Sequence, residues 1–314
     1  MRAPAIFGLL CILVLSLFSW TLMTGPVDLS LYPPDIQDEI FYEVRLPRAV
    51  ASLLCGISLS VSGLSLQSVF RNPLCGPFVL GISSGASLGA ALALLLGVGF
   101  GSFSLLGGAS CGALAVTLAV LFFARRFKGP SILVVGLLIG YFVDAAVSIV
   151  VDRADAESLK VFVSWGMGSF GRMTADGIAP FFLVTLAGLL LLTCSMKYLN
   201  ACRLGEDFAR GLGIRVGLSR TLVLLGCSIL AGASTAFCGP VAFVGIAIPH
   251  LTYLLFKSSN HRVLLPGSAL CGAILCLLAG KVGEGVPLNS ILSIVGVPVV
   301  LWVLVRSRKR GMYD

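Results

Sequence analysis

Long stretches without a charged residue divide this chain into segments that can each cross a membrane. About 20 apolar residues span the hydrocarbon core of a bilayer as a helix. Six stretches supply one such segment each: 3–27, 49–70, 129–151 (interrupted by Asp144), 177–196, 263–280 and 285–305. Two longer stretches, 72–124 and 221–256, can each hold two helices. The pattern predicts an all-α polytopic membrane protein with about ten transmembrane helices, forming a single domain over residues 1–314.

Glycine and proline mark where the two longer stretches must turn. We expect one hinge within residues 97–108, which are rich in glycine, and another at Cys238-Gly239-Pro240. With 57% hydrophobic and 11% charged residues, the chain lies outside the range of soluble globular proteins. The 10 cysteines lie singly, mostly in apolar stretches, and are interpreted as small membrane-compatible side chains rather than disulfide partners.

The distribution of basic residues predicts the orientation. With ten helices both termini lie on one side, and 16 of the 22 Lys and Arg residues fall on that side and 6 on the other. Because cytoplasmic loops carry the excess of Lys and Arg, we expect both termini to be cytoplasmic. The first apolar stretch is long enough to be a retained helix rather than a cleaved signal peptide.

Three segments lie outside the predicted spans. The outer segments are 28–48 and 152–177, and the second is expected to form a short interfacial helix with Trp165 near headgroup level. The cytoplasmic loop at about 199–216 is expected to hold a short helix from about Glu206 to Leu212, between Gly205 and Gly213. No phosphate-binding loop motif is present, so any ATP chemistry must come from another polypeptide.

A proline- and glycine-rich stretch follows the second predicted span. Irregular backbone at membrane depth must be buried in protein or line a water-filled cavity. Gly76-Pro77 therefore indicates either tight helix packing or a discontinuous helix beside a transport route. The stretch from Gly239-Pro240 to Ile246 is similar to that from Gly76-Pro77 to Ile82 and lies five helices later. This offset favours an inverted repeat, as in transporters.

An enzyme is the other function class that we consider. Residues 81–85 match the pattern G-x-S-x-G around Ser83, and His250 lies within a predicted span, which would suit an intramembrane serine protease. That motif belongs at a strand-to-helix turn in a soluble sheet, so a transporter is favoured. His250 is either a hydrogen-bonded packing residue or a substrate contact. Asp144, which we expect to be buried mid-span, is either functional or pairs helices, and Tyr141 one turn earlier could hydrogen-bond it.

Many of these residues together resemble the FecCD-type permease family of ABC importers for iron chelates, haem and vitamin B12. The resemblance covers residues 40 to 300 in the family's order. It rests on Arg45-Leu46-Pro47-Arg48, Gly63, Gln67, Arg71-Asn72-Pro73-Leu74, Pro77, Leu80-Gly81, Gly85-Ala86, Trp165, Gly168-Ser169, Leu204-Gly205-Glu206, Ala209, Leu212-Gly213, Gly239-Pro240, Phe243-Val244-Gly245 and Pro249-His250.

The resemblance implies a type II importer permease in the bacterial cytoplasmic membrane. Two permease subunits, identical or different, would surround one pathway. Two separate ATPase subunits would bind ATP and magnesium, and a periplasmic or lipid-anchored binding protein would deliver the cargo. The chain itself would have no enzymatic activity, no cofactor and no nucleic-acid partner. An iron(III)-siderophore is the expected cargo, and haem or cobalamin is the alternative.

The resemblance also implies roles for individual residues. Binding-protein docking falls on Arg45, Arg48 and Lys281, and ATPase coupling on Leu204, Gly205, Glu206, Ala209, Leu212 and Gly213. Positions on the translocation pathway or at helix breaks are Gln67, Asn72, Pro73, Pro77, Gly81, Ser83, Gly85, Asp144, Gly239, Pro240, Pro249 and His250. The sequence departs from the family where Tyr253 replaces an arginine, and in a short last outer loop, residues 280–287, where Lys281 stands in for the usual basic residue.

Overall fold

The computed structural model describes residues 2–25, 31–95, 103–124, 126, 131–283 and 285–308, and every regular element in these ranges is helical. The elements are α1 (Arg2–Met23), α2 (Pro34–Ile40), the π-helical turn η2 (Phe41–Arg45), α3 (Leu46–Phe70), the 3-10 turn η3 (Pro77–Leu80), α4 (Ile82–Leu95), α5 (Phe103–Ala124), α6 (Ser131–Asp152), α7 (Ala156–Gly166), the 3-10 turn η4 (Phe170–Arg172), α8 (Ala175–Cys194), α9 (Met196–Cys202), α10 (Glu206–Gly211), α11 (Val216–Cys238), α12 (Val244–Phe256), α13 (His261–Val282) and α14 (Leu288–Arg308).

The predicted spans correspond one to one with helices. Seven stretches of the described chain are long and apolar enough to cross a membrane; they contain α1, α3, α5, α6, α8, α11 and α13. Three shorter apolar helices, α4, α12 and α14, fill the remaining places in the predicted order. The all-α multi-pass architecture is confirmed.

The hinge predictions had different outcomes. The second hinge is confirmed, because α11 ends at Cys238 and α12 begins at Val244. Of the first predicted hinge, residues 97–102 lie outside the described residues, and the remainder is helical because α5 begins at Phe103. Glycine is tolerated in a membrane helix, where no water competes for backbone hydrogen bonds. Gly107 and Gly108, at the end of the predicted stretch, therefore belong to α5.

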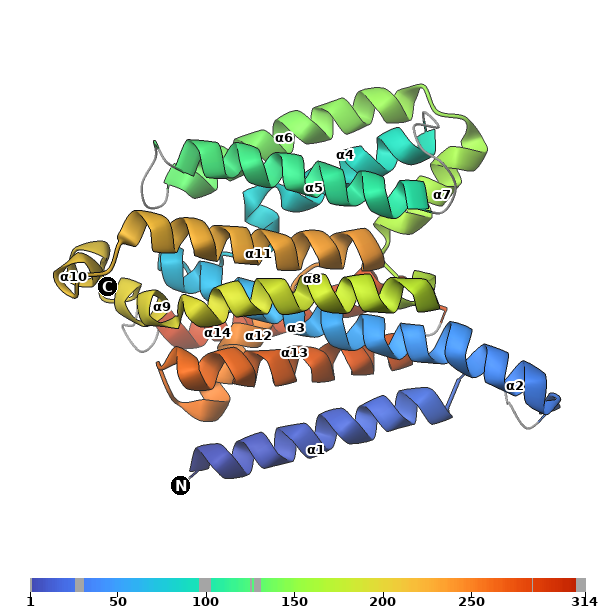
Figure 1. The fold of residues 1–314 in the computed structure, drawn as a ribbon, viewed down its shortest axis with the longest axis horizontal. Coiled ribbons are helices and arrows are strands. Elements are labelled where there is room, and N and C mark those ends of the chain that lie inside the picture. Colours follow the sequence, from blue (N-terminus) through green and yellow to red (C-terminus); the bar gives the residue numbers. More distant parts are fainter. Residues whose placement is uncertain are drawn as a thin grey trace.

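The helices form layers around α3 (Figure 1). Helix α3 is buried over most of its length and packs against α8, α11, α12 and α13. Helices α4, α5 and α6 lie together on one side of α11, and α1 lies at the opposite edge beside α13. Since α4 and α5 face α11 while α6 faces outward, much of α6 is exposed on the single chain.

Small residues allow the closest helix crossings. A methyl group added at Gly56 would collide with the backbone of Gly272 where α3 crosses α13. Likewise, one added at Gly89 would collide with the backbone of Gly108 where α4 crosses α5. Because lipid tails are as apolar as leucine side chains, membrane helices associate through such close packing rather than through the hydrophobic effect.

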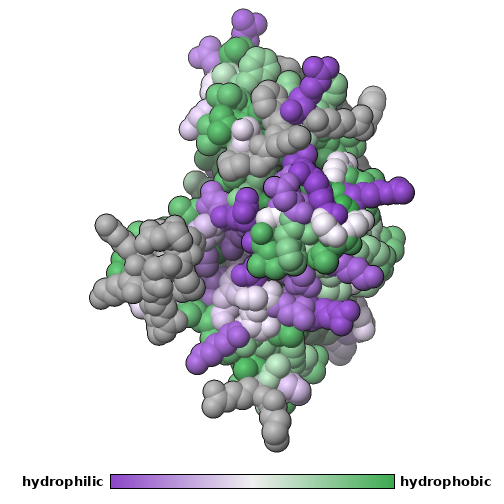
Figure 2. Space-filling model, turned by 90° about the vertical axis from the view of Figure 1, so that its left-hand side faces the viewer, coloured by the Kyte–Doolittle hydropathy of each residue, from purple (hydrophilic) through white to green (hydrophobic). Residues whose placement is uncertain are grey.

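The two ends of the bundle differ. Helix α10 and the first turn of α1 lie at one end, here called the α10 end, and α2 and α7 lie at the other, the α7 end (Figure 1). At the α10 end, Phe7 of α1 contacts Phe256 of α12, with ring centroids 4.6 Å apart. Hydrophilic side chains protrude across the α10 end (Figure 2). The helix predicted between residues 152 and 177 is α7, capped by Asp155, which accepts a hydrogen bond from Ser158 N at 2.9 Å.

Candidate functional site

Two interruptions of the helices form the centre of the candidate site. The first lies between α3 and α4, where Arg71 and Gly81 both have left-handed backbone conformations, with φ of 49° and 70°. Asn72 Oδ1 accepts a hydrogen bond from Leu74 N at 3.0 Å and stabilises the turn. A methyl group at Gly81 would lie 2.8 Å from Gly136 O, so this position needs glycine for its conformation and for the close approach of α6.

The second interruption lies between α11 and α12. Gly239 has φ of 76°, and a methyl group there would lie 2.5 Å from Trp165 O. Phe243 also has a positive φ, 65°, immediately before α12 begins. The predicted helix breaks at Gly76-Pro77 and Gly239-Pro240 are therefore both present.

The two interruptions meet beside α3. Pro77 Cδ would lie 2.9 Å from a methyl group on Gly245, and Gln67 of α3 donates from Nε2 to the carbonyl of Gly245 at 3.3 Å. From this junction α4 runs toward the α7 end and α12 toward the α10 end. Two half-length helices that start together and run in opposite directions match the directions expected of an inverted repeat.

His250 closes the same junction. Its Nε2 lies 2.9 Å from the carbonyl oxygen of Pro73. Because a carbonyl only accepts hydrogen bonds, Nε2 carries the proton and donates. In the described part of the chain no hydrogen bond joins His250 to Ser83. The structure thus supports the packing interpretation of His250 and does not assemble the serine–histidine pair of a protease.

Asn289, at the start of α14, is a residue that the sequence analysis missed. Its Nδ2 donates to the carbonyl of Pro240 at 2.7 Å and to that of Gly166 at 3.4 Å. Its Oδ1 accepts from the backbone nitrogen of Ala242 at 3.0 Å. One amide side chain therefore ties the second interruption to the end of α7 and to α14. No motif marks it, since a single asparagine after Pro287-Leu288 resembles an ordinary helix start.

Trp165 is placed differently from the expectation. It is 1% exposed and stacks against Phe162, with ring centroids 6.1 Å apart, so it lies inside the protein rather than among lipid headgroups. Its carbonyl oxygen lies close to Gly239, so the end of α7 packs against the second interruption.

A second site lies at the α10 end, in the segment predicted for ATPase coupling. The observed helix α10, Glu206–Gly211, agrees with the predicted one and lies between Gly205 (φ 120°) and Gly213 (φ 76°). Ala209 is fully buried. Leu204, Phe208 and Leu212, spaced four residues apart, are 69%, 47% and 60% exposed. Exposed apolar side chains gathered at one end of a protein are typical of a contact surface for another protein.

Ion pairs fix α10 to the bundle. Glu206 pairs with Arg220 of α11 and with Arg210, each at 3.2 Å. Arg220 is buried and also donates to the carbonyl of Ala124 at 3.2 Å, which is the last residue of α5. Glu206 and Arg220 therefore connect α10 to α11 and to the end of α5.

A buried hydrogen-bond network next to α10 was also missed. His261 is fully buried; its Nε2 lies 2.8 Å from Ser68 Oγ of α3, and its Nδ1 lies 2.8 Å from Asn200 Oδ1 of α9. The network joins three elements beside the coupling segment. The sequence contains only two histidines, and this one stands in a polar turn where nothing indicates burial.

The predicted docking residues hold helix ends at the α7 end. Arg45 is 7% exposed, and its Nη1 donates to the carbonyls of Leu22 and Met23 at the end of α1. Lys281 Nζ donates to Thr24 O at 3.0 Å, and Arg48 Nη2 donates to Gly280 O at 2.6 Å. Basic groups stabilise helix C-termini because they oppose the partial negative charge of the free carbonyls. Arg45 is thus buried against the end of α1 rather than exposed, and its docking role stays a prediction.

Asp144 is also placed differently from the expectation. We expected it to be buried, but it is exposed on α6, halfway along the span, next to Tyr141, which is 65% exposed. No hydrogen bond joins the two side chains in the described part of the chain. The helices that pack on α6 cover its other face.

An all-helical multi-pass fold in which two short apolar helices begin at a common junction is typical of a membrane permease. The sequence profile of the FecCD transport family matches residues 6–306. The chain belongs to the FecCD transport family.

Individual relatives agree with this assignment. The vitamin B12 import system permease protein BtuC of Salmonella typhi is 36% identical over 281 residues, covering 86% of this chain and 85% of that protein. BtuC of Salmonella arizonae is also 36% identical, covering 86% and 84%. A solved chain of a metal-chelate type ABC transporter in an inward-facing conformation superposes with a TM-score of 0.88 at 29% identity, covering 96% and 99%.

A more distant structure is PsaBC from Streptococcus pneumoniae in complex with Fab, which superposes with a TM-score of 0.61 at 16% identity. The match covers 86% of this chain and 94% of that one and shows a shared fold alone. The chain is therefore a permease subunit of an ABC importer with the type II permease fold, and ATP hydrolysis resides in partner chains. The two BtuC relatives are named for the import of vitamin B12.

Proposed function

We propose that this chain, with a second permease subunit, forms the pathway through which a corrinoid of the vitamin B12 type enters a bacterial cell. The observation that carries the proposal is the 36% identity to vitamin B12 import permeases over 86% of the chain. A ferric siderophore is the second candidate, supported by the structural likeness to a metal-chelate type transporter. Haem import by the same machinery is a third outcome of the test below.

The proposal assigns the α10 end to the cytoplasm. The excess of basic residues on that side supports it, and so does the exposed row Leu204, Phe208 and Leu212. This row would enter a groove of an ATPase subunit, which binds ATP and magnesium. Closure of two such subunits would push α10, and the pairing of Glu206 with Arg220 would pass the movement to α5 and α11.

The α7 end would then face outward and receive a periplasmic or lipid-anchored binding protein. The cargo would pass between the two permease subunits along the exposed face of α6, which carries Asp144. The junction of the two helix interruptions would fix the positions of α4 and α12 relative to each other beside this route. A carboxylate halfway across a membrane costs about 3 kcal/mol in lipid, so a water-filled route is the better environment for it.

The test is a reconstitution. The permease is purified from its host with the subunits that remain bound, placed in lipid nanodiscs, and assayed for ATP hydrolysis. Each extracytoplasmic binding protein of the host is then added, loaded with cyanocobalamin, a ferric hydroxamate or haemin. Stimulation by the cobalamin-loaded protein alone is expected. Stimulation only by the ferric or haem-loaded protein would replace the cargo, and a permease without a bound ATPase would overturn the proposal.

A further inference from the structure

Asp144 places a carboxylate halfway along α6, on the face that the other helices of the chain leave exposed. At 1.5 Å per residue it lies about 12 Å from the end of the helix at Asp152 and about 20 Å from its start at Ser131. Ionisable side chains at such a depth typically mark substrate or ion pathways, because lipid is a costly medium for charge. The position of Asp144 therefore points to a role along the route of the cargo.

The elements around α6 offer no positive charge to Asp144. Helix α6 packs mainly against η3, α4 and α5. None of these three elements contains a charged residue, and α6 itself contains only Asp144 and Asp152. Within this described layer of the chain, the charge of Asp144 is therefore not balanced by a cation.

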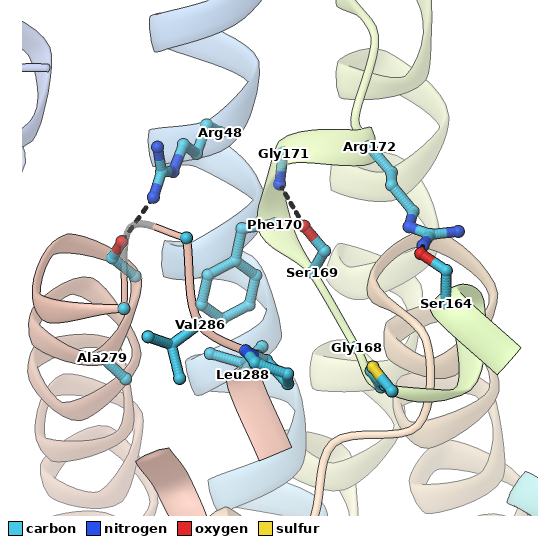
Figure 3. Close-up of a pocket in the computed structure, with 15 residues that line it drawn as sticks. Arg48, Ser164, Gly168, Ser169, Phe170, Gly171, Arg172, Ala279, Val286 and Leu288 are labelled. Carbon is cyan, nitrogen blue, oxygen red and sulfur yellow. Dashed lines mark hydrogen bonds between the residues drawn. The ribbon is translucent and has the colours of Figure 1, made fainter. Parts of the chain in front are cut away.

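The basic groups at the α7 end belong to other elements. Arg48 and Arg172 stand on opposite sides of a pocket of about 360 Å³ (Figure 3). Arg48 Nη2 donates to Gly280 O at 2.6 Å, and Arg172 Nη2 donates to Ser164 Oγ at 2.8 Å. Among the described residues, none that lines this pocket belongs to α6. The positive charge of the α7 end and the negative charge at mid-span are thus carried by separate parts of the fold.

Tyr141 and Ser148 lie on the same side of α6 as Asp144. Residues three and four positions apart are neighbours on a helix surface, and both of these residues are exposed. The Ser148 hydroxyl donates to the backbone carbonyl of Asp144 at 3.0 Å. One turn before Tyr141, Leu137 is exposed and apolar. Because a carboxylate only accepts hydrogen bonds, this polar row suits a ligand that brings N–H donors or positive charge.

We propose that Asp144 selects cargo by charge, favouring neutral or cationic molecules that carry N–H donors and disfavouring anionic chelates. The inference rests on the proposed function, which places the route along this face of α6. A fixed carboxylate repels an anion more strongly where the dielectric constant is lower than in bulk water, and charged side chains set the charge selectivity of pores in this way. The peripheral amides of a corrinoid offer N–H donors, whereas haem propionates and ferric catecholates are negatively charged.

The experiment measures uptake into proteoliposomes that contain the complete importer and a saturating amount of loaded binding protein. Two cargoes of nearly equal size are compared, neutral cyanocobalamin and the monocarboxylate made by hydrolysing one of its propionamides. The ratio of their uptake rates is determined for wild type, Asp144→Asn and Asp144→Glu with the same binding protein. We expect Asp144→Asn to raise the relative uptake of the monocarboxylate about fivefold or more, and Asp144→Glu to keep the wild-type ratio.

Two further variants make the test specific to charge at mid-span. Asp152→Asn removes an exposed carboxylate at the end of the same helix and should leave the ratio unchanged. Ser148→Asp adds a carboxylate one turn from Asp144 and should lower the relative uptake of the monocarboxylate further, which tests the inference independently of Asp144→Asn. Size-exclusion elution with the bound ATPase confirms that each variant is assembled.

The outcomes separate the inference from the proposed function. An unchanged ratio in Asp144→Asn and Ser148→Asp, with wild-type uptake intact, would overturn the inference and leave the proposed function in place. Loss of the second permease subunit from Asp144→Asn, with a wild-type ratio in the complex that remains, would mean that Asp144 pairs helices and would also overturn it. Preferred uptake of haemin by the wild type would contradict it directly. If the wild type takes up no loaded cargo, both fail.

Discussion

At the scale of single residues, the same side chain can serve docking or folding, and the spacing along the chain does not separate the two. Arg45 and Arg48 lie at the mouth of α3, where the sequence suggested a basic docking surface. In the structure Arg45 is buried against the end of α1 and Arg48 donates to the end of α13. The positive charge of Arg45, which suggested docking, stabilises a helix terminus in the structure.

We therefore predict that Arg45→Gln lowers stability rather than partner affinity. The loss of two charge-assisted hydrogen bonds to the carbonyls of α1 should cost about 1–3 kcal/mol. The unfolding temperature of the detergent-solubilised complex is the measurement. Arg153→Gln, at an exposed residue of the same end, is the control and should leave this temperature unchanged. A fall in binding-protein affinity with an unchanged unfolding temperature would return Arg45 to the docking surface.

Asn289 is the second residue-scale test. Asn289→Asp keeps the acceptor for Ala242 N but replaces the donor to Pro240 O with a carboxylate oxygen. Two oxygens would then face each other in a partly buried site, at a cost of about 1–3 kcal/mol. We expect a lower unfolding temperature and reduced uptake. Asn289→Gln, which retains both groups on a longer stem, should be milder, and equal effects would mean that the amide donor is unimportant.

At the scale of elements, close crossings decide which helices pair. Helices α4 and α5 approach until the backbones of Gly85 and Gly112, and of Gly89 and Gly108, are in contact. Such contact needs glycine at particular turns of each helix. Glycine content alone does not reveal which turns these are, as residues 103–108 show by belonging to α5.

Neighbouring glycines of α5 provide a matched pair of variants. A methyl group at Gly108 would lie 2.5 Å from Gly89 O, whereas one at Gly107 has nothing within 4 Å. We expect Gly108→Ala to destabilise the protein by about 1–3 kcal/mol through overpacking. Gly107→Ala should be neutral or slightly stabilising, because alanine favours the helix. The unfolding temperatures of the two variants provide the comparison, and equal values would refute the close crossing.

The coupling segment makes a separate element-scale prediction. Phe208 is 47% exposed and has few contacts to lose, so Phe208→Ser should leave the fold intact and weaken attachment of the ATPase. Removing a large apolar anchor from an interface typically costs more than about 1 kcal/mol of binding. The measurement is the ATPase retained through size-exclusion chromatography, with transport per ATP hydrolysed as a second readout. Asp207→Ser, at the neighbouring and strongly exposed residue, is the control.

At the scale of the whole molecule, one face of α6 is left uncovered by the other helices of the chain. The carboxylate of Asp144 is exposed at mid-span on α6. Lipid is an unfavourable medium for a carboxylate. Contact with another protein chain or with water would be a more favourable environment for this carboxylate than lipid. The structure of the single chain does not determine what contacts this face, because its own helices cover only the other side of α6.

A labelling experiment tests the aqueous alternative in the reconstituted complex. We expect Asp144→Cys to react with a charged, membrane-impermeant thiol reagent, because a water-filled route would reach it. The native Cys11, exposed within α1, should react about tenfold more slowly if it faces lipid, where few thiolates form. Peptide-level mass spectrometry separates the sites. Equal, slow reaction at both positions would place Asp144 away from water.

The sequence by itself determined the number, order and apolar character of the helices, the break before α12, and the position of α10. These features depend on transfer of consecutive side chains and their backbone into lipid, which is a property of each local stretch. The tertiary structure decided which polar groups meet. Arg48 bonds a residue 232 positions away and His250 one 177 positions away. Contacts across such separations depend on helix packing. The burial of Arg45 against the end of α1 and the exposure of Asp144 therefore appear only when the helices are assembled.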